Sequence, residues 1–182
     1  MDVREAIAKR KSVRAYVDRP LSDEDLKTIV EAGRWAPNSG PFLITVLRRP
    51  DLKQRLDEVT HRAMLESGVE FLQMRASLPG YRPLYGAPVV VLLTTPSDAP
   101  RGPMDCALSA ANMILQATEL GISSCFIVTP GLGLAAQPEL ATELGLPEGH
   151  AFQCAVLLGY PADRDPYSNP DRQPKGAVNY VD

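Results

Sequence analysis

At 182 residues and 19.8 kDa the chain has room for one domain but hardly for two, and its 45% hydrophobic and 23% charged residues are typical of a globular protein. A net charge of -3 and a sequence pI near 5.4 give no electrostatic reason to bind nucleic acid or an acidic membrane surface. Residues 1–14 lack an apolar signal region, no stretch is as long as a membrane span, and three widely spaced cysteines fit reduced thiols, so we expect a cytoplasmic protein.

The first half of the chain predicts helices followed by two strands. Residues 2–10 have helical character, and a second helix should begin after Ser22, whose spacing to Asp25 suits an N-terminal cap, and end at Gly33. We expect a strand over 42–47 and helical stretches over 50–77. The apolar run 87–95 is typical of a central strand buried on both faces.

The segment 103–120 predicts a helix with one narrow polar stripe. The rest of its circumference is apolar or small, so most of it should be covered. Two interpretations remain open: a central core helix, or a helix packed both on its own sheet and on a partner subunit. The stripe consists of Asp105, Ser109, Asn112, Gln116 and Glu119.

The remaining elements are a strand over 124–129, a helix over 135–144 and a strand over 152–158. Helices first, then strands separated by helices, predict an α+β or α/β sandwich with a central mixed sheet flanked by helices. We assign residues 1–160 to one domain and 161–182 to a proline-punctuated C-terminal arm. The arm either frays or docks on a neighbouring subunit as an added strand.

The best candidate for an anion site is the string Arg10-Lys11-Ser12-Val13-Arg14. If it is extended, Arg10, Ser12 and Arg14 alternate onto one face and present two guanidinium groups and a hydroxyl to one phosphate. If the helix continues, the cluster is a solvated basic face. No Rossmann or P-loop glycine motif offers another phosphate site.

The same string opens a series of short motifs that occur in a fixed order. They are Ala15-Tyr16, Arg34-Trp35-Ala36-Pro37-Asn38-Ser39, Gly86-Ala87-Pro88, Ala111-Asn112-Met113-Ile114-Leu115, Gly121, Leu146-Pro147-Glu148-Gly149 and Leu158-Gly159-Tyr160-Pro161. Together these motifs resemble the nitroreductase family of FMN enzymes, over about residues 3–161. The resemblance implies a domain-swapped homodimer with two FMN sites at the interface, each built from both subunits.

The resemblance also implies roles for particular residues. Arg10 and Ser12 would hold the FMN phosphate, with Lys11 in the same cluster, and Arg14 would lie nearer the ribityl chain and the pyrimidine edge of the flavin. A cation near the C-terminus, either Arg172 or Lys175, would complete the phosphate site.

Two loops would complete the flavin site. Asn38 and Ser39 match a polar loop that usually comes from the partner chain, although the loop is short here and lacks the family's glutamine. Val128 and Thr129, with Gly131 beyond them, match the place where backbone N–H groups meet flavin N5 and O4.

The implied activity is transfer of hydride from NADH or NADPH through FMN to a small acceptor such as a nitroaromatic, a quinone or an activated alkene. No side-chain nucleophile or metal is needed. Alternatives are an FMN-binding or sensor module with little turnover, or a relative that dehalogenates its substrate or modifies flavin. The segment 64–85, which helps cover the family's substrate pocket, is short, so we expect an open or partner-completed pocket.

Overall fold

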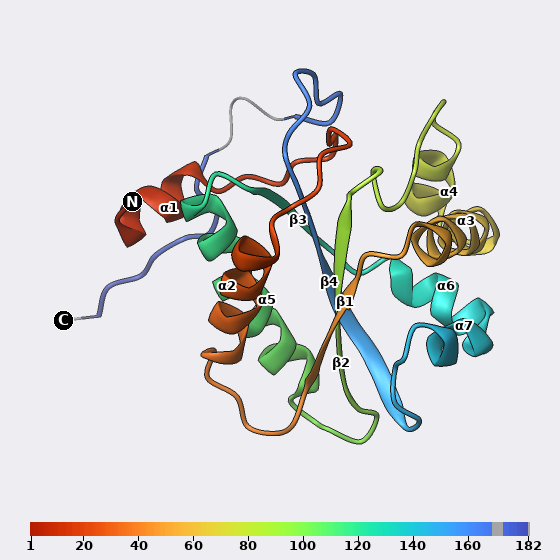
Figure 1. Cartoon of the computed structure of the whole chain (residues 1–182). Helices are drawn as coiled ribbons and strands as arrows, with labels where there is room; N and C mark the ends of the chain where they lie inside the picture. The colour runs from red at the N-terminus through yellow and green to blue at the C-terminus, as the bar shows by residue number, and fades with distance from the viewer. Residues whose placement is uncertain (169–172, 182) are drawn as a thin grey trace.

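The computed structural model describes residues 1–168 and 173–181. In these residues the chain forms seven helices and four strands, in an α+β arrangement (Figure 1). The elements in chain order are α1 (Val3–Lys9), α2 (Asp23–Arg34), β1 (Leu43–Leu47), α3 (Pro50–Glu66), α4 (Glu70–Ala76), β2 (Val89–Pro96), α5 (Gly102–Glu119), β3 (Ser123–Ile127), α6 (Pro130–Ala136), α7 (Pro138–Glu143) and β4 (His150–Gly159).

The four strands form one sheet in the order β1-β2-β4-β3, and every neighbouring pair is antiparallel. The prediction of a mixed sheet is therefore wrong for the described strands. The pattern of strands separated by helices on which it rests does fit two of the strands, because β2 and β3 run in the same direction and are joined through α5. The last strand, β4, inserts between them and pairs antiparallel with both, a long-range event that local patterns do not report.

Helices cover both faces of the sheet, so the two inner strands are apolar on both sides (Figure 1). Along β2, Val89, Val91 and Leu93 pack in a cluster with α2 and α5, whereas Val90 and Leu92 pack in a second cluster with α3, α6 and α7. The alternation follows the two-residue period of a strand. It confirms that the apolar run near residue 90 is a strand buried on both faces.

Helix α5 lies between the sheet and α2, and the first three residues of its polar stripe face inward, whereas Glu119 at its end is exposed. Asp105 and Ser109 are buried, and the Asn112 side chain donates a hydrogen bond of 3.2 Å to the Ala32 carbonyl of α2. The opposite face is apolar and open, with Met104 67% and Leu108 44% exposed. The expectation that the apolar circumference is covered therefore does not hold within a single chain.

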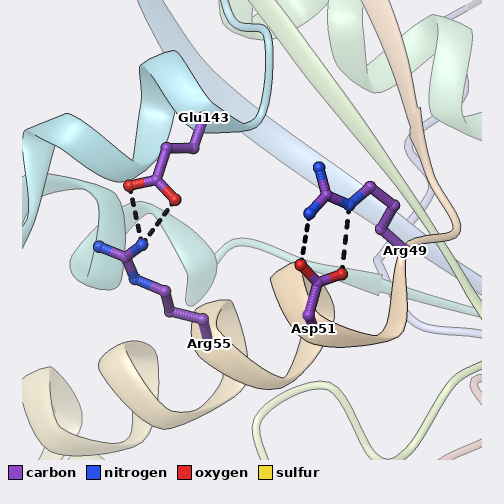
Figure 2. Close-up of polar contacts among 4 residues, drawn as sticks. All are labelled: Arg49, Asp51, Arg55 and Glu143. Carbon is purple, nitrogen blue, oxygen red and sulfur yellow. Dashed lines mark hydrogen bonds and ion pairs between the residues drawn. The ribbon is translucent and has the colours of Figure 1, made fainter.

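On the other side of the sheet, α3 and α6 pack with their backbones close together at Gly133. A Cβ at Gly133 would stand 2.5 Å from Thr60 Oγ1 and 2.9 Å from the Thr60 backbone nitrogen, so only glycine fits there. At the surface, Arg55 of α3 is ion-paired with Glu143 of α7 (Figure 2). Arg49, just before α3, bonds Asp51 in its first turn (Figure 2).

The C-terminal arm leaves the body of the chain on the side of α1 (Figure 1). Residues 173–181 form no strand, and Val178, Tyr180 and Val181 are more than 70% exposed. Docking on a neighbouring subunit stays a prediction. Within the described ranges, no helix combines the length and apolar character that crossing a bilayer requires.

Candidate functional site

The basic segment 10–14 is extended, which decides between the two interpretations of its sequence. Helix α1 stops because Arg10 takes an extended ψ of 125° at its C-cap. Ser12 then forms a parallel bridge with Ser124 of β3, and the Val13 N–H donates to the Ser124 carbonyl at 2.9 Å. Val13 is buried, whereas Ser12 and Arg14 on either side of it are half-buried. The alternation expected of an extended strand is thus present.

This segment lines a hollow of about 400 Å³, which we call the basic hollow. Four cationic side chains line it and, among the described residues, no carboxylate does, which suits an anionic ligand. Lys175 is one of the four, whereas Arg172, the other candidate for the C-terminal cation, lies outside the described residues. The residues that line the basic hollow are Arg10, Lys11, Ser12, Arg14, Ser168, Gln173, Pro174 and Lys175.

A second hollow, of about 580 Å³, adjoins the first at Arg14, which lines both; we call it the aromatic hollow. Val128 and Thr129 contribute to its wall directly after β3, which ends at Ile127, two residues earlier than predicted. Its aromatic lining residues are Phe71, Tyr81, Tyr85, Phe126 and Tyr167. Both hollows fall in the range of about 300 to 1,000 Å³ that small-molecule sites occupy.

Arg14 is held at the boundary of the two hollows by the C-terminal tail. Its backbone N–H donates to Asp165 Oδ2 at 2.8 Å, and the other oxygen of this carboxylate accepts the Tyr167 N–H at 2.9 Å. The guanidinium bonds the Ser12 carbonyl at 3.4 Å. One carboxylate therefore fixes the backbone of two residues that line the aromatic hollow.

The thiol of Cys125, which lines the aromatic hollow, is not activated as a nucleophile. Burial raises the pKa of Cys125, and the Arg14 guanidinium offsets part of that rise. Burial also raises the pKa of Tyr16, whose hydroxyl donates to the Val13 carbonyl at 2.7 Å. Both groups stay protonated near neutral pH, so they act in packing and positioning.

Three expected site residues lie elsewhere in the single chain. The Ser39 N–H and hydroxyl bond the Asp105 carboxylate at 3.1 and 3.0 Å, and Asn38 lines a separate hollow beside Arg34. The Gly131 N–H donates to the Val128 carbonyl at 3.2 Å, and Gly131 lines neither the basic nor the aromatic hollow. A role for these residues in cofactor binding stays a prediction.

Sequence reasoning missed Arg75, the three tyrosines of the aromatic hollow, and Asp165. Tyr81 and Tyr85 are near-neighbours in sequence, but Tyr167 joins them only in space, with ring centroids 6.3 and 5.6 Å away. The one signal in the sequence is the segment 64–85, which contains Arg75, Tyr81 and Tyr85 and which the family resemblance assigns to the cover of the substrate pocket. The tail gives none, because its sequence predicts either a frayed end or an arm docked on a neighbouring subunit, and neither places it in a site of its own chain.

Comparison with known proteins decides the family. A family model described as "Nitroreductase family" matches residues 7–160. The chain belongs to the nitroreductase family. The resemblance drawn from its short motifs is confirmed, and membership makes the chain an oxidoreductase.

Solved members of the nitroreductase family have the same fold. A nitroreductase from Bacteroides fragilis with bound FMN superposes with a TM-score of 0.87 at 33% identity, over 100% of both chains. One from Desulfitobacterium hafniense, also with bound FMN, gives 0.83 at 30% identity, over 98% of this chain and 100% of the other. An NADPH-flavin oxidoreductase from Vibrio harveyi is 28% identical, over 91% of this chain and 68% of the relative.

Proposed function

We propose that this nitroreductase-family chain binds FMN and passes hydride from NADH or NADPH to a small acceptor. One observation carries the proposal: a hollow lined by four cations joins an aromatic-lined hollow at Arg14. This combination matches the two ends of FMN, an anionic phosphate and a planar ring system. The FMN named for the two solved nitroreductases and the NADPH-flavin oxidoreductase activity named for the Vibrio relative support it.

In this arrangement the chain itself binds and orients. Arg10, Ser12 and Lys175 hold the phosphate, with Lys11 adding positive charge at the rim. Arg14, which lines both hollows, would place a fixed cation near the flavin ring and so favour its electron-rich reduced state. A flavin held there would supply the hydride chemistry through its N5, so the chain itself would need no nucleophile. Val128 and Thr129, which line the aromatic hollow, would meet the N5 and O4 edge of the flavin through their backbone N–H groups.

The active assembly is a homodimer in this proposal. The exposed apolar face of α5 lies beside α1, which exposes Val3 and Ile7, and the apolar end of the arm is also open. Large apolar side chains exposed on neighbouring elements are typical of an interaction site. A second copy would cover it, and the partner's Asn38 and Ser39 would then reach the flavin. The arm would add to the partner's sheet.

Anaerobic spectroscopy tests the proposed function. The purified protein, supplied with FMN, should retain a yellow chromophore that is released on denaturation. NADH or NADPH should bleach it within seconds to minutes, and menadione should restore the colour. A protein that rejects FMN would overturn the proposal, whereas one that binds FMN but is not bleached would be the binding or sensor module.

A further inference from the structure

Arg75 of α4 points its guanidinium into the group of tyrosines that lines the aromatic hollow. Its Nη2 donates a hydrogen bond of 3.0 Å to the Tyr85 hydroxyl. The guanidinium carbon lies 5.0 Å from the centroid of the Tyr167 ring and 5.4 Å from that of Tyr81. One neutral hydrogen bond and two cation–π contacts fix its orientation but cancel none of its charge.

The charge of Arg75 is not balanced by an acid. Within the described part of the chain, no carboxylate lies within 4.0 Å of its nitrogens, and the lining of the aromatic hollow contains two arginines and neither Asp nor Glu. Asp165, behind Arg14, already accepts two backbone N–H groups. Several arginines elsewhere do have acidic partners: Arg34, Arg48, Arg49, Arg55 and Arg82.

The walls around this cation suit a ring. Tyr81, Tyr85 and Tyr167 meet at centroid distances of 5.6 to 6.3 Å, and Phe71 and Phe126 extend the apolar lining. Aromatic edges and faces bind a planar apolar ring, and an uncompensated guanidinium binds a planar carboxylate through paired N–H groups. The flavin ring would occupy this hollow on the side of Arg14, so a second ligand that combines a planar ring with a carboxylate would satisfy the remaining aromatic lining and the charge of Arg75 together.

We infer that the preferred electron acceptor is an aromatic compound that carries a carboxylate, and that Arg75 binds this carboxylate. The inference rests on the proposed function, because it names the substrate class of the same site. Arg75 acts in recognition and takes no part in the transfer of hydride. The tyrosines hold the guanidinium in place before the acceptor arrives, which reduces the entropy lost on binding.

A matched pair of acceptors measures the preference. The FMN-loaded protein is assayed with 4-nitrobenzoate and with 4-nitrobenzamide, which have the same shape but differ in charge. We expect KM for the benzoate to be lower by about tenfold or more, the scale of a charge-assisted hydrogen bond. Arg75→Gln should abolish the difference by raising KM for the benzoate, and Arg75→Lys should restore part of it. Equal KM values in the wild type would overturn the inference.

Equilibrium binding separates recognition from turnover. Benzoate and benzamide, which are not reduced, are titrated into the oxidised FMN-loaded protein and followed by the flavin absorbance. Arg75→Gln should raise Kd for benzoate by about tenfold and leave that for benzamide within about twofold. Arg62→Gln is the matched control, because it removes the same charge at a position that is exposed on α3 and lines neither hollow. Equal effects of the two variants would contradict a local role for Arg75.

The same guanidinium could instead meet a phosphate of the nicotinamide donor. If Arg75→Gln raises KM for NADPH and leaves benzoate binding unchanged, the residue recognises the donor and the inference is overturned. Menadione, a neutral quinone, keeps the two proposals distinguishable. A protein that reduces menadione without preferring the benzoate refutes the inference alone, whereas one that binds no FMN refutes the proposed function.

Discussion

The backbone N–H of Arg14 donates a 2.8 Å hydrogen bond to the Asp165 carboxylate, joining residues 151 positions apart. An acid in the C-terminal tail thus fixes the basic segment that follows the first helix. It does so through the backbone, so the Arg14 guanidinium stays directed at the two hollows that it lines. The tail is therefore a structural part of the candidate cofactor site.

Replacing Asp165 should loosen that site. In Asp165→Ala the N–H groups of Arg14 and Tyr167 lose their acceptor, and we expect FMN affinity to fall by about tenfold, in line with the loss of charge-assisted hydrogen bonds. Isothermal titration with FMN measures the change. Asp163→Ala, at an exposed position two residues earlier, should leave the affinity unaltered. Similar losses in both variants would count against a specific role for Asp165.

Gly133→Ala should destabilise the contact between α3 and α6. The added Cβ would stand 2.5 to 3.0 Å from atoms of Thr60, two of them in the backbone, which cannot move without shifting α3. Overpacking of this kind costs about 1 to 3 kcal/mol of unfolding free energy. Urea unfolding measures it, with Gly40→Ala as the control because a methyl group added there would meet nothing within 4 Å. An unchanged free energy of unfolding in Gly133→Ala would show that the two helices can move apart at little cost.

The buried thiols predict a loss of stability in alkali. Burial raises the pKa of Cys106 to about 11 and that of Cys154 to about 12, from an ordinary value of 9.0. Above pH 9 the unfolded chain releases these protons while the folded chain keeps them, so their contribution is complete below pH 9 and declines as the pH rises. Between pH 9 and about 11 for Cys106, and between pH 9 and about 12 for Cys154, each thiol should lower the free energy of unfolding by about 1.4 kcal/mol per pH unit.

Urea unfolding between pH 8 and 10.5, with a reductant present, measures the slope. Cys106→Ala should flatten it, whatever its effect on stability at pH 8. A slope identical to that of the wild type would mean that the Cys106 thiol ionises as readily in the folded protein as in the unfolded chain.

Charges on the open face of α5 should prevent association. Met104→Lys with Leu108→Glu places two charges where a second copy would bury apolar side chains, so the double variant should sediment as a monomer and the wild type as a dimer. Leu65→Glu, on the exposed side of α3, controls for a general effect of added charge. A monomeric wild type, or a double variant that remains dimeric, would contradict the proposed interface.

Local signals in the sequence predicted local structure well. Ser22 caps α2 as expected, with its hydroxyl accepting the Asp25 N–H at 3.0 Å, because the residues that decide the cap are three positions apart. The apolar runs predicted their strands for the same reason. The insertion of β4 into the sheet could not be read locally, since it depends on pairing with strands far away along the chain.

The candidate site was predictable to the extent that one segment carries it. Residues 10, 12 and 14 could be assigned to one phosphate site from their alternation. Whether the segment is extended depends on the bridge from Ser12 to Ser124, which the local sequence does not report. Asp165 and Tyr167 could not be found, because nothing in a polar, proline-rich tail indicates that it folds back on the first strand-like segment. Arg75 could not be found because its uncompensated charge is a property of its surroundings.

The most direct test of the account compares the affinities of FMN and riboflavin, which differ by the phosphate alone. We expect the wild type to prefer FMN by about 100-fold, as several charge-assisted hydrogen bonds to the phosphate allow. Arg10→Gln with Lys175→Gln should reduce that preference at least tenfold while riboflavin affinity changes by less than about twofold. If the variant and the wild type show the same preference for FMN, the basic hollow does not hold the phosphate and the account is contradicted.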